Sequence, residues 1–107
     1  MSKIDKFGDF NKGLTRYQLE IGEYYSRVYK DGSKTIFKFS GSIDNDYVKV
    51  SMCTDTFQEI FEEDSIITIS KEGTGIGSYI IDATQEDIDF LDKRKEMYDN
   101  GYFDNLY

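Results

Sequence analysis

The sequence predicts an α+β fold: a mainly antiparallel sheet of about five strands, a short middle helix and a C-terminal helix. Two observations lead to this prediction. Segments rich in aromatic and β-branched residues, separated by short turn sequences, fill much of the chain. A capped segment with helical spacing of its apolar residues follows near the end. Strands joined by short turns pair antiparallel, so we expect a meander in the first half of the chain.

The N-terminal part of the chain has the weakest pattern. Residues 1–12 mix Gly, Asn, Lys and Asp around two Phe residues, and we expect an arm that docks weakly or stays mobile. Residues 14–23 fit a helical stripe and a strand alternation equally well. The aromatic and β-branched segment that follows favours the strand, with Gly22 as a candidate bulge.

A hairpin is the strongest strand signal. Residues 24–30 and 34–40 flank Asp31-Gly32, a favoured two-residue hairpin turn that suits the positive φ angles of type I′. A second turn, over residues 43–46, leads into a third strand over 47–52. The residues of this strand that should share one face are Val48, Val50 and Met52.

A short helix is predicted to follow. Thr56 and Glu59 have the spacing of a capping box, and Phe57, Ile60 and Phe61 supply an apolar side. Three acidic residues would end this helix, where negative charge opposes the helix dipole. They are Glu62, Glu63 and Asp64. Residues that lower helix stability without a compensating local interaction are typical of functional positions.

A second hairpin is predicted from residues 66–70 and 79–82. Its Gly-rich loop, residues 71–77, lacks the strand-glycine-helix order and the Lys of a phosphate-binding loop, so we interpret it as a flexible hairpin tip.

The last helix begins at Thr84, with Asp87 three residues further on as a capping partner. It runs to about Tyr98 and stops at Asn100-Gly101.

Length and composition predict one domain over residues 1–107, because 38% hydrophobic residues in a chain of this length supply one modest core. The net charge is −8, and it is unevenly placed. Residues 1–40 have eight basic and five acidic side chains, whereas residues 41–107 have five and sixteen. Such a field repels nucleic acid and attracts basic surfaces, so we expect no direct nucleic-acid binding.

Several chemistries are disfavoured by the residues that the chain lacks. There is no His, which removes the commonest general base and metal ligand, and Cys53 is alone, so no disulfide or Cys-based metal site is expected. Acidic turns such as residues 44–46 lack the spacing of a calcium loop. We therefore expect no enzyme activity, no cofactor and no metal. No stretch of signal-peptide or membrane-spanning type is present, which predicts a cytoplasmic protein without a membrane partner.

The last helix offers the most informative candidate site. Asp89, Asp92, Glu96 and Asp99 fall on one stripe, with neighbours about 5–6 Å apart. One interpretation is a solvated helix face. The other is that these carboxylates imitate phosphates and dock in a basic groove. The second acidic cluster and the Tyr residues of the tail favour docking. The candidate partner-binding residues are Glu62, Glu63, Asp64, Asp89, Asp92, Glu96, Asp99, Tyr98, Tyr102 and Asp104.

The C-terminal part also suggests a group of proteins. Residues 75–82 followed by an acidic helix ending in Tyr98-Asp99-Asn100, in a Lys/Asp/Asn/Tyr-rich chain without Pro or His, resemble small acidic phage-encoded anti-defence proteins. Inhibitors of type II CRISPR effector nucleases (anti-CRISPR proteins) are among these. The resemblance implies a protein inhibitor in the host bacterial cytoplasm that binds a host nuclease and blocks its nucleic-acid channel or its catalytic domain.

Two other functions share parts of this reasoning. An immunity protein that neutralises a toxin nuclease would use the same electrostatics, and a structural or assembly protein of a phage would associate with copies of itself. The oligomeric state stays open at this point.

Overall fold

The computed structural model describes residues 13–57, 60–69 and 78–101. The N-terminal arm expected over residues 1–12 lies outside the described residues, as does the Gly-rich loop. The described elements are the 3-10 helix η2 (Arg16–Gln18), β1 (Tyr24–Tyr29), β2 (Lys34–Ser42), β3 (Tyr47–Asp55), β4 (Phe61–Thr68), β5 (Ser78–Asp82) and α1 (Gln85–Asp99).

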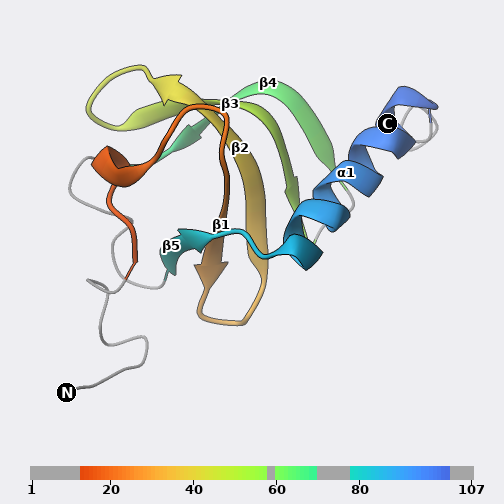
Figure 1. The fold of residues 1–107 in the computed structure, drawn as a ribbon, viewed down its shortest axis with the longest axis horizontal. Coiled ribbons are helices and arrows are strands. Elements are labelled where there is room, and N and C mark those ends of the chain that lie inside the picture. The colour runs from red at the N-terminus through yellow and green to blue at the C-terminus, as the bar shows by residue number, and fades with distance from the viewer. Residues whose placement is uncertain (1–12, 58–59, 70–77, 102–107) are drawn as a thin grey trace.

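The five strands form one antiparallel sheet in the order β4-β3-β2-β1-β5. The predicted α+β class and mainly antiparallel sheet are therefore confirmed. The sheet is strongly curved, and α1 crosses one of its faces (Figure 1). The predicted second hairpin is wrong, because β4 pairs with β3 whereas β5 returns to β1. This long-range pairing buries Ile80 completely in the core, which a local hairpin pattern does not reveal.

Both faces of the sheet are packed. The inner face holds the larger core cluster, made of Leu19, Tyr25, Phe37, Phe39, Val48, Val50, Cys53, Ile69 and Ile80. The outer face is the one that α1 covers. There Ile36 of β2, Phe61 of β4 and Leu91 of α1 form a second cluster. Because successive strand residues point to opposite faces, adjacent apolar residues of β2 serve both clusters.

The predicted middle helix is wrong where the structure describes it. Phe61 to Asp64 belong to β4, and Thr56 and Phe57 lie in a bend after β3, while residues 58 and 59 lie outside the described part. Phe61 is 3% exposed and pairs with Thr54 of β3. A helix of one or two turns is marginal by itself, so pairing with β3 and burial of Phe61 override the capping pattern.

Residues 14–23 are not the expected strand either. Arg16–Gln18 form the 3-10 helix. The expected bulge at Gly22 is present: Gly22, with φ 92°, donates from its backbone nitrogen to Phe39 O at 2.8 Å, and Phe39 N donates to Glu23 O at 3.0 Å. The Arg16 guanidinium is buried and donates to the backbone carbonyls of Asp44 and Ile69. These contacts with distant segments fix the turn, and local periodicity contains no sign of them.

The first hairpin is confirmed, but its turn differs in type. Gly32 has φ 92° while Asp31 does not have a positive φ, so the turn is not type I′. Backbone bonds join Gly32 N to Tyr29 O and Tyr29 N to Ser33 O, each at 2.9 Å. The loop is thus a three-residue type I turn followed by a left-handed glycine, the next most common hairpin connection.

The third strand is confirmed, but the predicted face of Met52 is wrong. Val48 and Val50 are fully buried on the inner face, whereas Met52 packs on the outer face. Lys38 pairs with Met52 and Phe39 with Val50, so Ser51 is an extra residue in β3. This β-bulge reverses the alternation beyond it.

The predicted ends of α1 are confirmed. Thr84 is the N-cap and forms a reciprocal capping box with Asp87. The helix ends at Asp99, and Gly101 follows with φ 81°. The Asp87 carboxylate also accepts hydrogen bonds from Ser26 Oγ of β1 at 2.9 Å and from Lys34 Nζ of β2 at 3.0 Å. One side chain therefore joins the start of the helix to two strands.

We predict that Asp87→Ala lowers the free energy of unfolding by about 2–4 kcal/mol, because it leaves Ser26 and Lys34 without their partner. Thr84→Ala, which removes only the cap, should cost about 1 kcal/mol. Urea unfolding followed by circular dichroism measures both values. Equal losses in the two variants would show that the bonds to the sheet contribute nothing.

The same residue predicts a pH dependence. Burial raises the pKa of Asp87, but the hydrogen bonds from Lys34, Ser26 and the Thr84 backbone outweigh it, so this pKa lies below its usual value of 3.8. The stabilisation is therefore complete above about pH 4 and is lost as the pH falls through the folded-state pKa. As the pH is lowered through this range, the free energy of unfolding should fall more in wild type than in Asp87→Ala.

Gly13 gives a further test of the fold. A Cβ atom at this position would lie 2.8 Å from Tyr79 Cβ and 2.9 Å from the Ile80 backbone nitrogen of β5. Gly13→Ala should therefore destabilise the protein by about 1–3 kcal/mol. Gly32→Ala is a useful comparison, since no atom lies within 4 Å of its Cβ position and only backbone strain at φ 92° opposes it. An unchanged midpoint of urea unfolding for Gly13→Ala would mean that the backbone at Gly13 does not pack against β5.

Candidate partner-binding surface

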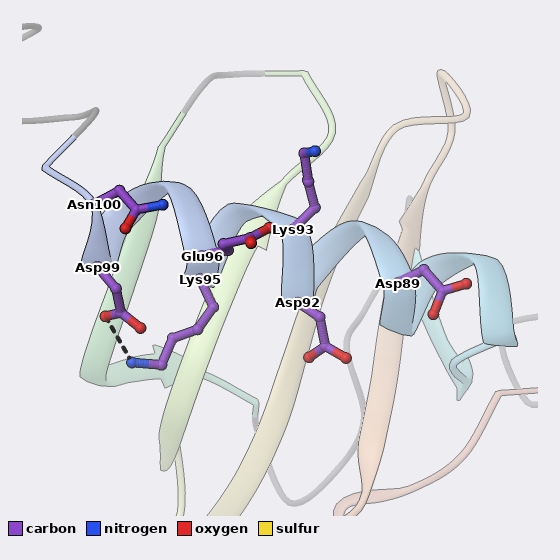
Figure 2. A pocket seen from close by; sticks show the side chains of 7 residues that line it. All are labelled: Asp89, Asp92, Lys93, Lys95, Glu96, Asp99 and Asn100. Atoms are coloured by element: carbon purple, nitrogen blue, oxygen red, sulfur yellow. Dashed lines mark hydrogen bonds and ion pairs between the residues drawn. The ribbon is translucent and has the colours of Figure 1, made fainter.

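The outward face of α1 presents the predicted row of carboxylates. Leu91 is fully buried against the sheet, with Phe90 and Met97 partly buried beside it, so the apolar side of the helix is used for packing. The opposite side forms a shallow, open surface (Figure 2). Its lining residues are Asp89, Asp92, Lys93, Lys95, Glu96, Asp99 and Asn100. The four acidic residues of the predicted stripe thus do share one exposed face.

The second acidic cluster meets this row at a single lysine. Lys95 Nζ lies 2.5 Å from Glu63 Oε2 of β4 and 3.0 Å from Asp99 Oδ1 of α1. Hydrogen bonds to Glu63, and then to Asp99, raise the pKa of Lys95. Because the three side chains are about one-third to one-half exposed, this cluster lies at the surface. Lys95 was not a predicted site residue, since the proximity of β4 to the end of α1 is a tertiary feature.

The other two members of that cluster do not join the row. Glu62 points to the other side of β4, where its Oε1 accepts from Ser65 Oγ at 2.8 Å and lies 4.0 Å from Cys53 Sγ. Asp64 is exposed and has φ 51°, a left-handed conformation inside a strand. The structure therefore brings Glu63 to the acidic face of α1 and separates Glu62 from it.

The resulting surface stays negative despite its lysines. Five carboxylates face two ammonium groups, those of Lys93 and Lys95. The remaining cation of α1, Arg94, has its guanidinium carbon 4.7 Å from the centre of the Phe90 ring. Neither Asp92 nor Glu96 has an ion-pair partner among the residues that the structure describes. Local pairing thus neutralises the row in part only, which leaves charge available to a partner.

The aromatic candidates divide between packing and exposure. The Tyr98 ring lies 5.1 Å from the Phe61 ring, yet Tyr98 remains 40% exposed. It therefore closes the outer cluster and offers surface at the same time. Tyr102 and Asp104 lie outside the described residues.

No arrangement typical of a metal site is found within residues 13–57, 60–69 and 78–101. The acidic turn before β3 is explained by backbone capping. Asp44 Oδ1 accepts from the backbone nitrogens of Asp46 at 2.9 Å and Tyr47 at 3.0 Å. This bonding pattern agrees with the interpretation of residues 44–46 as a turn.

Comparison with protein-family models, with curated proteins and with solved structures gives no match for this chain. In the described part, no helix is long and apolar enough to cross a membrane. A function for the protein therefore has to be argued from the acidic surface itself.

Cys53 offers a test of the chemistry of the inner face. Burial, followed by the nearby Glu62 carboxylate, raises the pKa of this thiol to about 11. At pH 8 its thiolate fraction should be lower than in the unfolded chain by roughly 100-fold. Labelling with iodoacetamide should slow by a comparable factor relative to the protein in urea. Labelling as fast as in urea would place Cys53 in an accessible, activated environment.

Proposed function

We propose that the protein is an inhibitor that uses the exposed carboxylates of α1, with Glu63, to bind a basic surface of a nucleic-acid-processing enzyme. The observation that supports this most is the row Asp89, Asp92, Glu96 and Asp99 on one outward helix face. Like charges at this spacing destabilise a helix slightly, so a partner that neutralises them recovers that cost.

The spacing of the row suits a surface that normally holds nucleic acid. Neighbouring acidic residues whose Cβ atoms lie about 5–6 Å apart offer Lys and Arg side chains a series of charges comparable to that along a phosphate backbone. Arg binds such groups in a planar, bidentate geometry, and an adjacent exposed ring such as Tyr98 provides a surface for stacking. The partner class that fits these features is a protein with a basic nucleic-acid channel.

Within that class, a CRISPR effector nuclease of a bacterial host is the partner we propose to test first. An acidic ligand seated in the nucleic-acid channel would compete with the DNA target, without any reaction of its own. The overall charge of −8 favours encounter with such a surface and makes binding sensitive to salt.

The test is DNA cleavage by a panel of purified, guide-loaded type II effector nucleases. Wild type should inhibit at least one of them. A variant with Asp89→Asn, Asp92→Asn, Glu96→Gln and Asp99→Asn should lose affinity by roughly tenfold or more, and the loss should shrink as salt rises above about 0.2 M. Binding of the protein to DNA alone should be undetectable.

A matched control removes four exposed carboxylates from outside the α1 row. Its changes are Glu20→Gln, Glu23→Gln, Asp46→Asn and Asp82→Asn. This control should inhibit nearly as well as wild type, because only its long-range attraction is weaker. Equal losses in both variants would argue for bulk charge rather than a defined surface. No inhibition of any nuclease in the panel would refute the proposed target.

A further inference from the structure

Among the strands that the structure describes, β4 forms one edge of the sheet. The opposite edge, β5, is covered in part by the N-terminal segment, where Leu14 N donates to Ile80 O at 2.7 Å. No described strand lies beyond β4. An uncovered edge presents backbone N–H and C=O groups with which another chain can pair.

The hydrogen-bond register shows which groups of β4 are available. Ile69 N donates to Asp46 O at 2.9 Å, so the next pair, Tyr47 and Thr68, does not exchange hydrogen bonds. The alternation then turns the backbone groups of Thr68 and Ile66 away from β3. Arg27 Nη1 confirms this orientation, since it donates to Thr68 O at 2.7 Å from outside the β3–β4 ladder. By the same alternation, Ile66 N–H and C=O lie outside the β3–β4 ladder.

In the described part of the chain, several apolar side chains beside this edge are exposed. Ile66 is 57% exposed and lies directly opposite Lys49 of β3, while Tyr47, which is 45% exposed, lies opposite Thr68. Ile43 is 49% exposed, and its backbone nitrogen bonds to Tyr47 O. These residues share the outer face beyond the end that α1 covers. Contiguous exposed apolar groups of this kind are typical of binding surfaces.

The charges beside β4 indicate what kind of chain would pair with this edge. Glu63 and Asp64 precede the open part of β4, and Glu63 is linked through Lys95 to the carboxylate row of α1. A second copy of the chain would bring another net charge of −8 to this edge, which opposes pairing of two β4 strands. A basic residue of an extended segment would instead gain attraction at Glu63 and Asp64. An apolar residue would contact Ile66, where Lys49 lies directly opposite and Arg27 binds Thr68 O.

We propose that β4 accepts an extended segment of the partner protein as a sixth strand, with a basic residue near Glu63 and Asp64 and an apolar residue against Ile66. This inference rests on the proposed function, because it assigns the partner a second contact beside the α1 row. Backbone hydrogen bonds to Ile66 would fix the register of the added strand. The carboxylates of Glu63 and Asp64 would select basic sequences.

The probe is a capped peptide of alternating lysine and valine, about eight residues long, added to the ¹⁵N-labelled protein. The amide signals of Ile66 and Thr68 should shift, and exchange of the Ile66 amide hydrogen should slow by roughly tenfold or more. The same peptide with a central proline should bind much more weakly.

Two substitutions separate the backbone from the side chain. Ile66→Pro removes the outward N–H without touching the β3 ladder and should abolish the shifts at β4. Ile66→Ala keeps the N–H and should weaken binding only severalfold. If Ile66→Pro does not fold, the exchange measurement on wild type still decides the question.

The outcomes distinguish this inference from the proposed function. Shifts confined to α1 would overturn the docking edge and leave the carboxylate row in place. Dimerisation without peptide, seen by sedimentation, would overturn it in favour of a second copy. Binding at β4 by the variant that lacks the four α1 carboxylates would support the edge even if no nuclease is inhibited.

Discussion

The bonds of Asp87 are the constraint on which the geometry of this protein depends. Its carboxylate completes the N-terminal cap of α1 and accepts from Ser26 of β1 and Lys34 of β2. The helix is thereby held at one end against two strands, with Leu91 packed one turn further on. Because the apolar side must face the sheet, the acidic side can only face outward. The candidate surface follows from this single anchored orientation.

Lys95 links the two parts of the acidic surface. By bridging Glu63, which lies 32 residues before it in sequence, and Asp99, it joins an edge strand to the end of the helix. The lysine reduces repulsion between the two carboxylates without cancelling the charge of the row. The helix face and the Glu63 end of β4 therefore form neighbouring parts of one negatively charged side, which one partner can contact at once.

Prediction from sequence succeeded where the signal is local and failed where it is not. The first hairpin and both ends of α1 were found from turn and capping residues, whose effects extend over three or four positions. The middle helix failed because Phe61 is buried by pairing with β3. The reversed face of Met52 follows from the Ser51 bulge, which depends on the register with β2. Glu62 and Glu63 looked equivalent, yet strand alternation sends them to opposite faces.

The sequence by itself determined the antiparallel sheet class, the capped final helix and the acidic row along it, since these depend on composition, periodicity and neighbouring residues. Only the tertiary structure decided that β5 pairs with β1, that β4 is an edge among the described strands and that Glu63 and Asp99 share Lys95. Such contacts join residues far apart in the chain, and their stability comes from burial and pairing that exist only after folding. No local pattern contains that information.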